Sequence, residues 1–232
     1  MNINEMTLEE FGALIDHTNL KADITDTDLT LLCDEAIQYH FATVAVNPYP
    51  VKFCKQYLKG TGIRVDAAIA FPLGQTTITD KVQETMNAIN DGADEIDYVL
   101  NIGRLKQHDY YYIRDEMRVI VDYCRACHVT SKVIFETCYL NDDEIVQAAR
   151  IAKEIRPDFI KTSTGFGMEG ATVEHVKLMK ETVGDLVKVK ASGGIRNLKT
   201  TLEMIEAGAE RIGTSSSTKI MKEFIDHKVN FI

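Results

Sequence analysis

The strongest constraint on the fold is a regular alternation between short β-rich runs and longer segments of helical character. Eight β-rich runs occur, namely LIDHT (14–18), TVAVN (43–47), VDAAIAF (65–71), EIDYVLNI (95–102), KVIFET (132–137), FIKTST (159–164), LVKVKAS (186–192) and RIGTSS (211–216). The segments between them, such as TDKVQETMNAIND and TVEHVKLMKETVG, place apolar residues at the spacing of amphipathic helices. Eight repeats in 232 residues give 29 residues each, which is the size of one βα unit.

Local signals for helix ends agree with this alternation. Thr7 and Glu10 form a capping-box pattern that predicts a short helix before the first strand, and NDDE (141–144) is typical of another helix start. In GADEIDY and GAERIGT, Gly92 and Gly208 suit the left-handed residue that often ends a helix, and a strand follows each of them.

The repeats predict a single α/β domain over residues 1–232, a closed (β/α)8 TIM barrel with a short N-terminal helix. No linker rich in Pro, Gly or Ser divides the chain. An open doubly wound sheet is the alternative, but no Gly-x-Gly-x-x-Gly motif follows the first strand.

Charge and hydropathy restrict the partners. The net charge is -9 and no long basic run occurs, so neither nucleic acid nor an anionic membrane surface is an expected partner. No apolar stretch reaches the roughly 20 residues of a membrane helix. The first residues, MNINEMTLEEF, lack a signal-peptide core, so we expect a cytoplasmic protein.

Cysteine and histidine usage favours a protein without metal or cofactor. The five cysteines form no disulfide framework, and CRAC (124–127) lies alone in a helical pattern. The six histidines show no metal-ligand spacing such as His-Glu-x-x-His. We therefore predict reduced thiols, no metal site and no cofactor.

The candidate catalytic residues lie near the ends of three strands, where the active site of a barrel forms. Alternation along the strands turns Lys161, Lys190 and Asp97 toward the barrel interior. The same alternation places Lys188 beside Glu95 one layer deeper, as a structural ion pair.

Lys161 ends an apolar run, and burial of a lysine disfavours its ammonium form. A second lysine nearby lowers the amine pKa further, and a neutral lysine attacks carbonyl groups to form a Schiff base. The structural alternative is that Asp97 and Lys190 form only an ion pair of the barrel core.

Two clusters of glycine and hydroxyl residues predict a phosphate site. SGG (192–194) follows the seventh strand, and GTSSS (213–217) follows the eighth and opens a helix. Backbone N–H groups at a helix N-terminus bind phosphate, and barrels often hold phosphate at this place. Ordinary turns and a serine cap are the alternative explanation.

Six segments closely resemble the bacterial deoxyribose-phosphate aldolases. They are DHTNLKADIT (16–25), ADEIDYVLNIG (93–103), KVIFETCYL (132–140), IKTSTGFGMEGATVEHVKLMK (160–180), VKASGGIRN (189–197) and RIGTSSS (211–217). The resemblance covers residues 13 to 218 in order.

This resemblance implies a metal-free class I aldolase that reversibly cleaves 2-deoxy-D-ribose 5-phosphate to D-glyceraldehyde 3-phosphate and acetaldehyde. It assigns the Schiff base to Lys161, the second lysine to Lys190 and the proton-relay aspartate to Asp97. Phosphate contacts are carried over to Gly193, Gly194, Gly213, Ser215 and Ser216, and neighbours of the substrate to Thr18, Thr164 and Gly165. A homodimer acting in deoxyribonucleotide catabolism is expected.

The sequence departs from the family pattern at four places. Family members often carry a cysteine within the second strand, where this sequence has Ala45. Some members use a C-terminal tyrosine in proton transfer, whereas this sequence ends DHKVNFI. Lys188 stands where many members have a small residue, and Phe166 where some have a lysine.

Two other functions remain open at this point. One is another class I aldolase or a transaldolase acting on a keto or larger sugar phosphate, which would not use acetaldehyde as donor. The other is a non-catalytic barrel that binds sugar phosphates and forms no imine. A metal-dependent aldolase is disfavoured by the lack of a histidine–carboxylate cluster.

Overall fold

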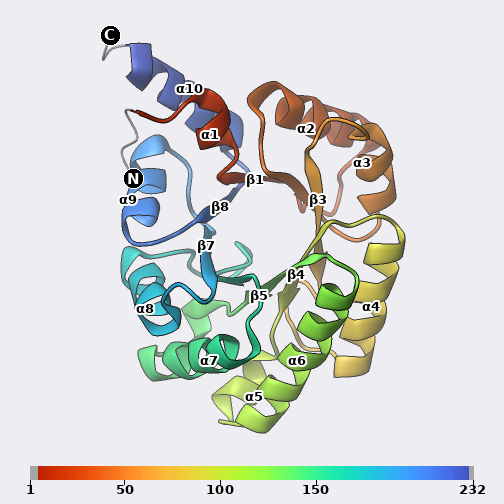
Figure 1. The fold of residues 1–232 in the computed structure, drawn as a ribbon, viewed down its shortest axis with the longest axis vertical. Helices are drawn as coiled ribbons and strands as arrows, with labels where there is room; N and C mark the ends of the chain where they lie inside the picture. The colour runs from red at the N-terminus through yellow and green to blue at the C-terminus, as the bar shows by residue number, and fades with distance from the viewer. Residues whose placement is uncertain (1–4, 230–232) are drawn as a thin grey trace.

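A computed structural model describes residues 5–229, which form a closed barrel of eight parallel strands inside a layer of helices (Figure 1). The strands are β1 (Ile15–Thr18), β2 (Thr43–Val46), β3 (Arg64–Ile69), β4 (Glu95–Val99), β5 (Thr130–Ile134), β6 (Phe159–Lys161), β7 (Lys188–Ser192) and β8 (Arg211–Thr214). Each strand pairs with the next, and β8 closes the barrel on β1 through the pair Ile15 and Ile212. The predicted (β/α)8 TIM barrel is confirmed.

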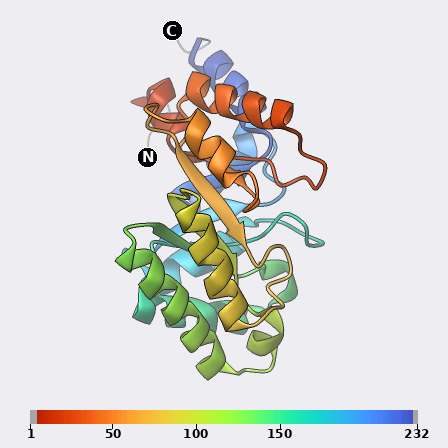
Figure 2. The ribbon, with the colours of Figure 1, turned by 90° about the vertical axis from the view of Figure 1, so that its right-hand side faces the viewer.

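The helices alternate with the strands as the repeat predicts. They are α1 (Leu8–Gly12), α2 (Asp26–Tyr39), α3 (Val51–Tyr57), α4 (Ile78–Asn90), α5 (Ile102–Lys106), α6 (Tyr110–Ala126), α7 (Asp142–Ile155), α8 (Val173–Val183), α9 (Leu198–Glu206) and α10 (Ser217–Val229), with a 3-10 turn η2 (Thr137–Tyr139). Seen from the side, the loops after β1 and β6 project beyond the same end of the barrel (Figure 2).

The predicted helix ends are confirmed. Thr7 and Glu10 form the capping box of α1, and Asn141 forms one with Glu144 at α7. Gly92 and Gly208 follow α4 and α9 with φ of +105° and +110°, a conformation that costs glycine little because it has no Cβ.

The apolar core lies between the strands and the helices. Helix α6 buries Ile113, Met117, Ile120, Val121 and Cys124, which lie on one face of a helix. On the sheet side, outward residues such as Ile96, Ile160 and Val189 are fully buried. The inward positions are therefore free to carry polar side chains.

Several strands end earlier than the sequence indicates, and the cause lies in the turns. Strand β4 ends at Val99 because Asn101 caps α5 by accepting the Arg104 N–H. Strand β5 ends at Ile134, since Glu136 adopts a left-handed φ of +56° and begins η2. These turns bring side chains over the C-terminal mouth of the barrel.

A buried ion pair holds the end of β4. The Lys81 ammonium lies 2.7 Å from Glu116 Oε1 and donates to the Val99 carbonyl, and Glu116 Oε2 accepts the Asn101 N–H. Both charged side chains are fully buried, so each depends on the other for a partner. The pair ties α4 and α6 to the strand that carries Asp97.

Within residues 5–229, no helix is both long and apolar enough to cross a membrane. The single domain over residues 1–232 stays a prediction, since its ends lie outside the described residues.

Candidate active site

Lys161, the last residue of β6, lies at the floor of the barrel mouth beside the two other candidate catalytic residues. Its Nζ is 2.6 Å from Asp97 Oδ2, and the same oxygen is 2.7 Å from Lys190 Nζ. The register explains the meeting, because Lys161 pairs with Lys190 across β6 and β7 and all three side chains point inward. The structure thus brings Lys161, Lys190 and Asp97 together.

The electrostatics separate the two lysines. Burial lowers the pKa of Lys161; Asp97 partly offsets this effect and the Lys190 charge adds to it. Burial also acts against the Lys190 ammonium, but the carboxylates of Asp16 and Asp97 outweigh it and raise the Lys190 pKa. Lys161 is therefore the amine that is more easily uncharged, and Lys190 remains a cation.

Asp97 stays ionised although it is buried. Burial alone would raise its pKa, but the three ammonium groups of Lys132, Lys161 and Lys190 hold the pKa well below its usual value. Its two oxygens then serve different partners, since Oδ1 lies 2.6 Å from Lys132 Nζ and Oδ2 faces Lys161 and Lys190.

Sequence reasoning placed Glu95 beneath these residues but missed the rest of a larger charge cluster there. Besides Glu95, the cluster contains Asp16, Asp66, Lys132 and Arg211. Lys132 Nζ lies 2.8, 2.7 and 2.6 Å from carboxylate oxygens of Asp66, Glu95 and Asp97. Arg211 lies 2.7 Å from Asp16. Strand alternation could have found them, because each occupies an inward position of a predicted strand.

The expected pair between Lys188 and Glu95 is wrong. Lys188 is an exposed residue at the start of β7, with its Nζ 5.6 Å from the centre of the Phe159 ring. Glu95 is fully buried and contacts Lys132, Arg64 and Arg211 instead. Lys188 is exposed whereas Glu95 is fully buried, so strand alternation did not give the depth of the Lys188 side chain.

Glu136 is another residue that sequence reasoning missed. It lies beyond β5, almost fully buried, and accepts hydrogen bonds from the backbone N–H and the hydroxyl of Thr164. Burial raises the pKa of Glu136. The contact fixes the start of the loop after β6, which includes the predicted neighbours Thr164 and Gly165.

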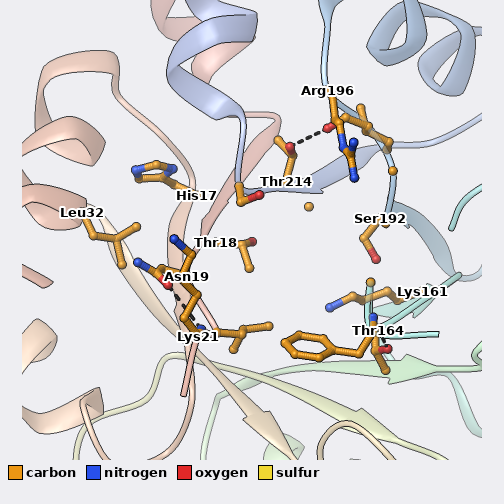
Figure 3. Close-up of a pocket in the computed structure, with 18 of the residues that line it drawn as sticks. His17, Thr18, Asn19, Lys21, Leu32, Lys161, Thr164, Ser192, Arg196 and Thr214 are labelled. Carbon is orange, nitrogen blue, oxygen red and sulfur yellow. Dashed lines mark hydrogen bonds between the residues drawn. The ribbon is translucent and has the colours of Figure 1, made fainter. Parts of the chain in front are cut away.

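A cavity of about 450 Å³ opens above Lys161 (Figure 3). The predicted residues that line it are Thr18, Lys161, Thr164, Gly165, Gly193, Gly194, Gly213 and Ser215. Ser216 is placed beside it, and its N–H donates to the Thr214 hydroxyl. Lys21 and Arg196 also line the cavity and were not predicted. Figure 3 shows the Arg196 side chain extending toward the cavity from the loop after β7.

The end of the cavity that the sequence predicts to bind phosphate is built mainly from backbone. Gly193 and Gly194 have φ of +85° and +77°, and Gly213 lies one residue before the end of β8. Helix α10 begins at Ser217, so its first N–H groups face the same region. This arrangement suits an anion in an acidic protein, because N–H groups supply the positive potential.

Three carboxylates of the cluster, Asp16, Asp66 and Glu95, have oxygens within 4.8 Å of one another. Cations already occupy the space between them, because Lys132, Lys190 and Arg211 contact these oxygens directly. The donor set fits these ion pairs rather than a metal ion. Residues 230–232, which bear on the C-terminal tyrosine of some family members, lie outside the described part of the chain.

Comparison with known proteins now decides the family. Residues 12–223 match the family of DeoC/LacD family aldolases. The chain belongs to this family. It is therefore an aldolase, a lyase that acts on carbon–carbon bonds.

The relatives agree over almost the full chain. Deoxyribose-phosphate aldolase from Lactobacillus acidophilus is 61% identical over 92% of this chain and 90% of its own length. The enzyme of the same name from Thermococcus kodakarensis is 51% identical, covering 94% and 98%. A solved structure from Aeropyrum pernix, described as a unique tetrameric deoxyribose phosphate aldolase, superposes with a TM-score of 0.88 at 28% identity, covering 95% and 93%. The fold of this chain is thus shared with a protein of that name.

Proposed function

We propose that this aldolase uses a Schiff base on Lys161 to cleave 2-deoxy-D-ribose 5-phosphate reversibly into D-glyceraldehyde 3-phosphate and acetaldehyde. The observation that carries the proposal is Lys161 itself, a buried amine of lowered pKa at the floor of a cavity whose other end suits phosphate. The names of the relatives support this substrate.

The reaction begins at the amine. Neutral Lys161 attacks the C1 carbonyl of the open-chain sugar, and loss of water gives a protonated imine. A base removes the proton of the C3 hydroxyl, the C2–C3 bond breaks, and its electron pair moves toward the imine. Glyceraldehyde 3-phosphate leaves, and the enamine of acetaldehyde stays on Lys161. Protonation at C2 and hydrolysis release acetaldehyde and restore the amine.

Lys190 and Asp97 are the groups proposed to move protons in these steps. Lys190 remains charged, so it can donate a proton, and its contact with Asp97 keeps it 2.7 Å from the oxygen that also meets Lys161. The Lys190 charge also favours the neutral form of Lys161.

The phosphate end is proposed to position the substrate relative to Lys161. Gly193, Gly194, Gly213, Ser215 and Ser216 are the assigned phosphate contacts, with Thr18, Thr164 and Gly165 along the sugar. Binding energy gained at the phosphate orients C1 toward Lys161, which lowers the entropic cost of attack.

The remaining assignments are also proposals. The chain is proposed to need no cofactor or metal, and to act in the cytoplasm in deoxyribonucleotide catabolism. A homodimer is proposed from the size of the barrel. The tetramer described for the Aeropyrum pernix protein supports self-association in the family, although not this particular stoichiometry.

The test is to trap the imine. The protein is incubated with limiting acetaldehyde and sodium borohydride, and peptide mass spectrometry locates the ethyl group. We expect one ethyl group on Lys161, and the same group when deoxyribose 5-phosphate replaces acetaldehyde, because its cleavage leaves the acetaldehyde imine on the same amine. Lys161→Met should lose it, while Lys188→Met, a change at an exposed lysine, should keep it.

Other outcomes would contradict the proposal. An ethyl group on Lys190 would mean that Lys190, and not Lys161, is the nucleophile. An imine with a larger sugar phosphate but none with acetaldehyde would favour a transaldolase-type reaction. Binding of sugar phosphate with no adduct would indicate a binding protein.

A further inference from the structure

Asp66 is a fully buried carboxylate inside the barrel, and the proposed chemistry assigns it no role. It lies on β3, and its Oδ2 contacts two ammonium groups, at 2.8 Å from Lys132 and 3.2 Å from Lys190. Its other oxygen, Oδ1, is buried without a hydrogen-bond partner among the described residues. A buried carboxylate is costly unless paired, so this placement needs a reason.

The two cations of Asp66 are the same two that contact Asp97. Lys132 lies 2.6 Å from Asp97 Oδ1, and Lys190 lies 2.7 Å from Asp97 Oδ2. Asp66, Lys132, Asp97 and Lys190 therefore form a closed ring of alternating charge, with one residue from each of β3, β5, β4 and β7. Lys161 contacts this ring through Asp97 Oδ2.

In this ring, each of the two ammonium groups is attracted to two carboxylates, Asp66 and Asp97. Each ammonium group is drawn toward Asp66 as well as toward Asp97, so neither is pulled wholly onto the oxygens of Asp97. Lys190 is further held by Asp16 at 2.5 Å. Without the negative charge of Asp66, Lys132 and Lys190 would each lose one carboxylate partner and would depend more on Asp97. Lys190 would then be held beside Lys161 by fewer contacts.

We propose that Asp66 is a positioning residue of the active site, which shares Lys132 and Lys190 with Asp97 and thereby fixes the charge that Lys161 meets. The proposal rests on the proposed function, because Asp66 would act through Lys161, the amine proposed to form the imine.

The sign of the effect follows from the charged groups that surround Lys161 and Asp66. These groups are Asp16 on β1, Glu95 and Asp97 on β4, Lys132 on β5, Glu136 after β5, Lys190 on β7 and Arg211 on β8. The Asp66 carboxylate favours the ammonium form of Lys161. Burial and the neighbouring Asp97 charge raise the pKa of Asp66 to about 6. Asp66 therefore exerts its charge on Lys161 above about pH 6 and loses it below.

The experiment compares wild type with Asp66→Asn, which keeps the shape and removes the charge. The rate of ethyl transfer to Lys161 from acetaldehyde and cyanoborohydride is measured against pH. Acetaldehyde has no ionisable group, so the acid limb of this profile reports the protein. Turnover of deoxyribose 5-phosphate is measured in parallel.

Two effects of opposite sign are expected. The acid limb of imine trapping should move to lower pH by about one unit, since Lys161 loses an attraction for its proton. Turnover near neutral pH should nevertheless fall several-fold, because Lys190 is held less firmly for proton transfer. The trapping rates of the two proteins should converge below about pH 6, where Asp66 of the wild type is itself neutral. A merely structural change would lower both rates together at every pH.

Glu95→Gln is the matched control. Glu95 is also fully buried and contacts Lys132 at 2.7 Å, but its other ion pairs are with Arg64 and Arg211. Its loss should leave the acid limb of trapping where the wild type has it. An equal shift in both variants would overturn the proposal, as would an unchanged profile in Asp66→Asn.

Two further measurements keep the test decisive. If Asp66→Asn does not fold, Asp66→Ser carries the same expectation with a smaller neutral side chain. In the wild type, carbon NMR of the aspartate carboxyl groups should show one buried carboxyl that titrates near pH 6, and its absence would count against the proposal. If wild type forms no adduct on Lys161, the proposed function itself fails, and this inference with it.

Discussion

Lys161 differs from the two other buried lysines of the cluster in the number of carboxylates it meets. Within residues 5–229, Lys132 and Lys190 each contact three carboxylates, whereas Lys161 contacts Asp97 alone. Burial disfavours all three ammonium groups, and the carboxylates reverse this effect only for Lys132 and Lys190. Of these three lysines, only Lys161 therefore has a lowered pKa, because it contacts fewer carboxylates.

Replacing Lys190 should shift the pKa of Lys161 in the direction opposite to the shift expected for Asp66→Asn. Lys190→Met keeps the length of the side chain and removes a positive charge that disfavours the Lys161 ammonium. We expect the acid limb of acetaldehyde trapping to move to higher pH by about one unit. Turnover of the sugar phosphate should fall by about 10²–10⁴-fold through loss of proton transfer.

Lys188→Met is the control for this change. Lys188 lies two residues earlier on β7 but is exposed, so both its pH profile and its turnover should match the wild type. A Lys190→Met protein that is folded and shows an unmoved acid limb would mean that Lys190 does not act on the charge of Lys161.

The sequence predicted which residues meet at the mouth but not what holds them. Lys161, Lys190 and Asp97 could be placed by strand alternation, which gives the side of the sheet that each faces. Depth inside the barrel depends on strand stagger and side-chain reach, and for this reason Lys188 was wrongly paired with Glu95. The partners of Lys132 could not be assigned, because four carboxylates surround it, namely Asp16, Asp66, Glu95 and Asp97.

At the scale of elements, the loops after β6 and β7 fit together through their glycines. The Ala171 N–H donates to the carbonyls of Ser192 and Gly193. A Cβ on Gly193 would lie 3.0 Å from the Gly170 Cα and 3.3 Å from the Ser163 Cβ. The proposed phosphate end therefore depends on close backbone contact between two loops.

Gly193→Ala should weaken the phosphate end selectively. Its φ of +85° costs an alanine about 1–2 kcal/mol, and the added methyl group must push the two loops apart. We expect the KM for deoxyribose 5-phosphate to rise at least about tenfold, on the order of the 1.4 kcal/mol that corresponds to that factor. Trapping of acetaldehyde on Lys161 should change little, because acetaldehyde has no phosphate.

Gly184→Ala is a matched comparison for the backbone strain. Gly184 also has a left-handed φ, of +63°, but nothing lies within 4 Å of an added Cβ, and it follows α8. It should lower the free energy of unfolding without changing the KM. If both variants have the same KM, the close loop contact does not shape the phosphate end.

The elements themselves were largely predictable, whereas their ends were not. All eight strands lie within or close to the predicted runs, since apolar alternation and turn residues mark them. Strands β4, β5 and β6 end earlier because Asn101 and Glu136 form turns, and because Lys161 is followed by a loop that bonds to β7. The Asn101 cap is local, since it joins residues three apart, whereas the contact of the Thr162 N–H with the Lys190 carbonyl is tertiary and leaves no local pattern.

At the scale of the whole molecule, the buried charges set how stability depends on pH. Burial raises the pKa of Asp66, Glu116 and Glu136 in the folded state. Such groups bind a proton more readily in the folded than in the unfolded chain, so they add stability as pH falls toward their unfolded pKa. Asp16 and Asp97 behave oppositely, because cations hold their folded pKa below the unfolded value despite burial.

The free energy of unfolding should therefore rise, and not fall, between neutral pH and about pH 5. Asp66, with its pKa raised to about 6, should contribute on the order of 1–3 kcal/mol to this rise. Below about pH 4 the contribution of Asp16 and Asp97 is progressively lost, because these two groups take up protons in the unfolded chain at a higher pH than in the folded state, and stability should fall. Urea unfolding at constant ionic strength, followed from pH 8 to pH 3, measures the curve. In Asp66→Asn the rise should shrink, because its largest source is gone. A stability that decreases steadily from neutral pH in the wild type would mean that Asp66 is ionised in the folded state at pH 5, and would contradict the charge balance of the barrel.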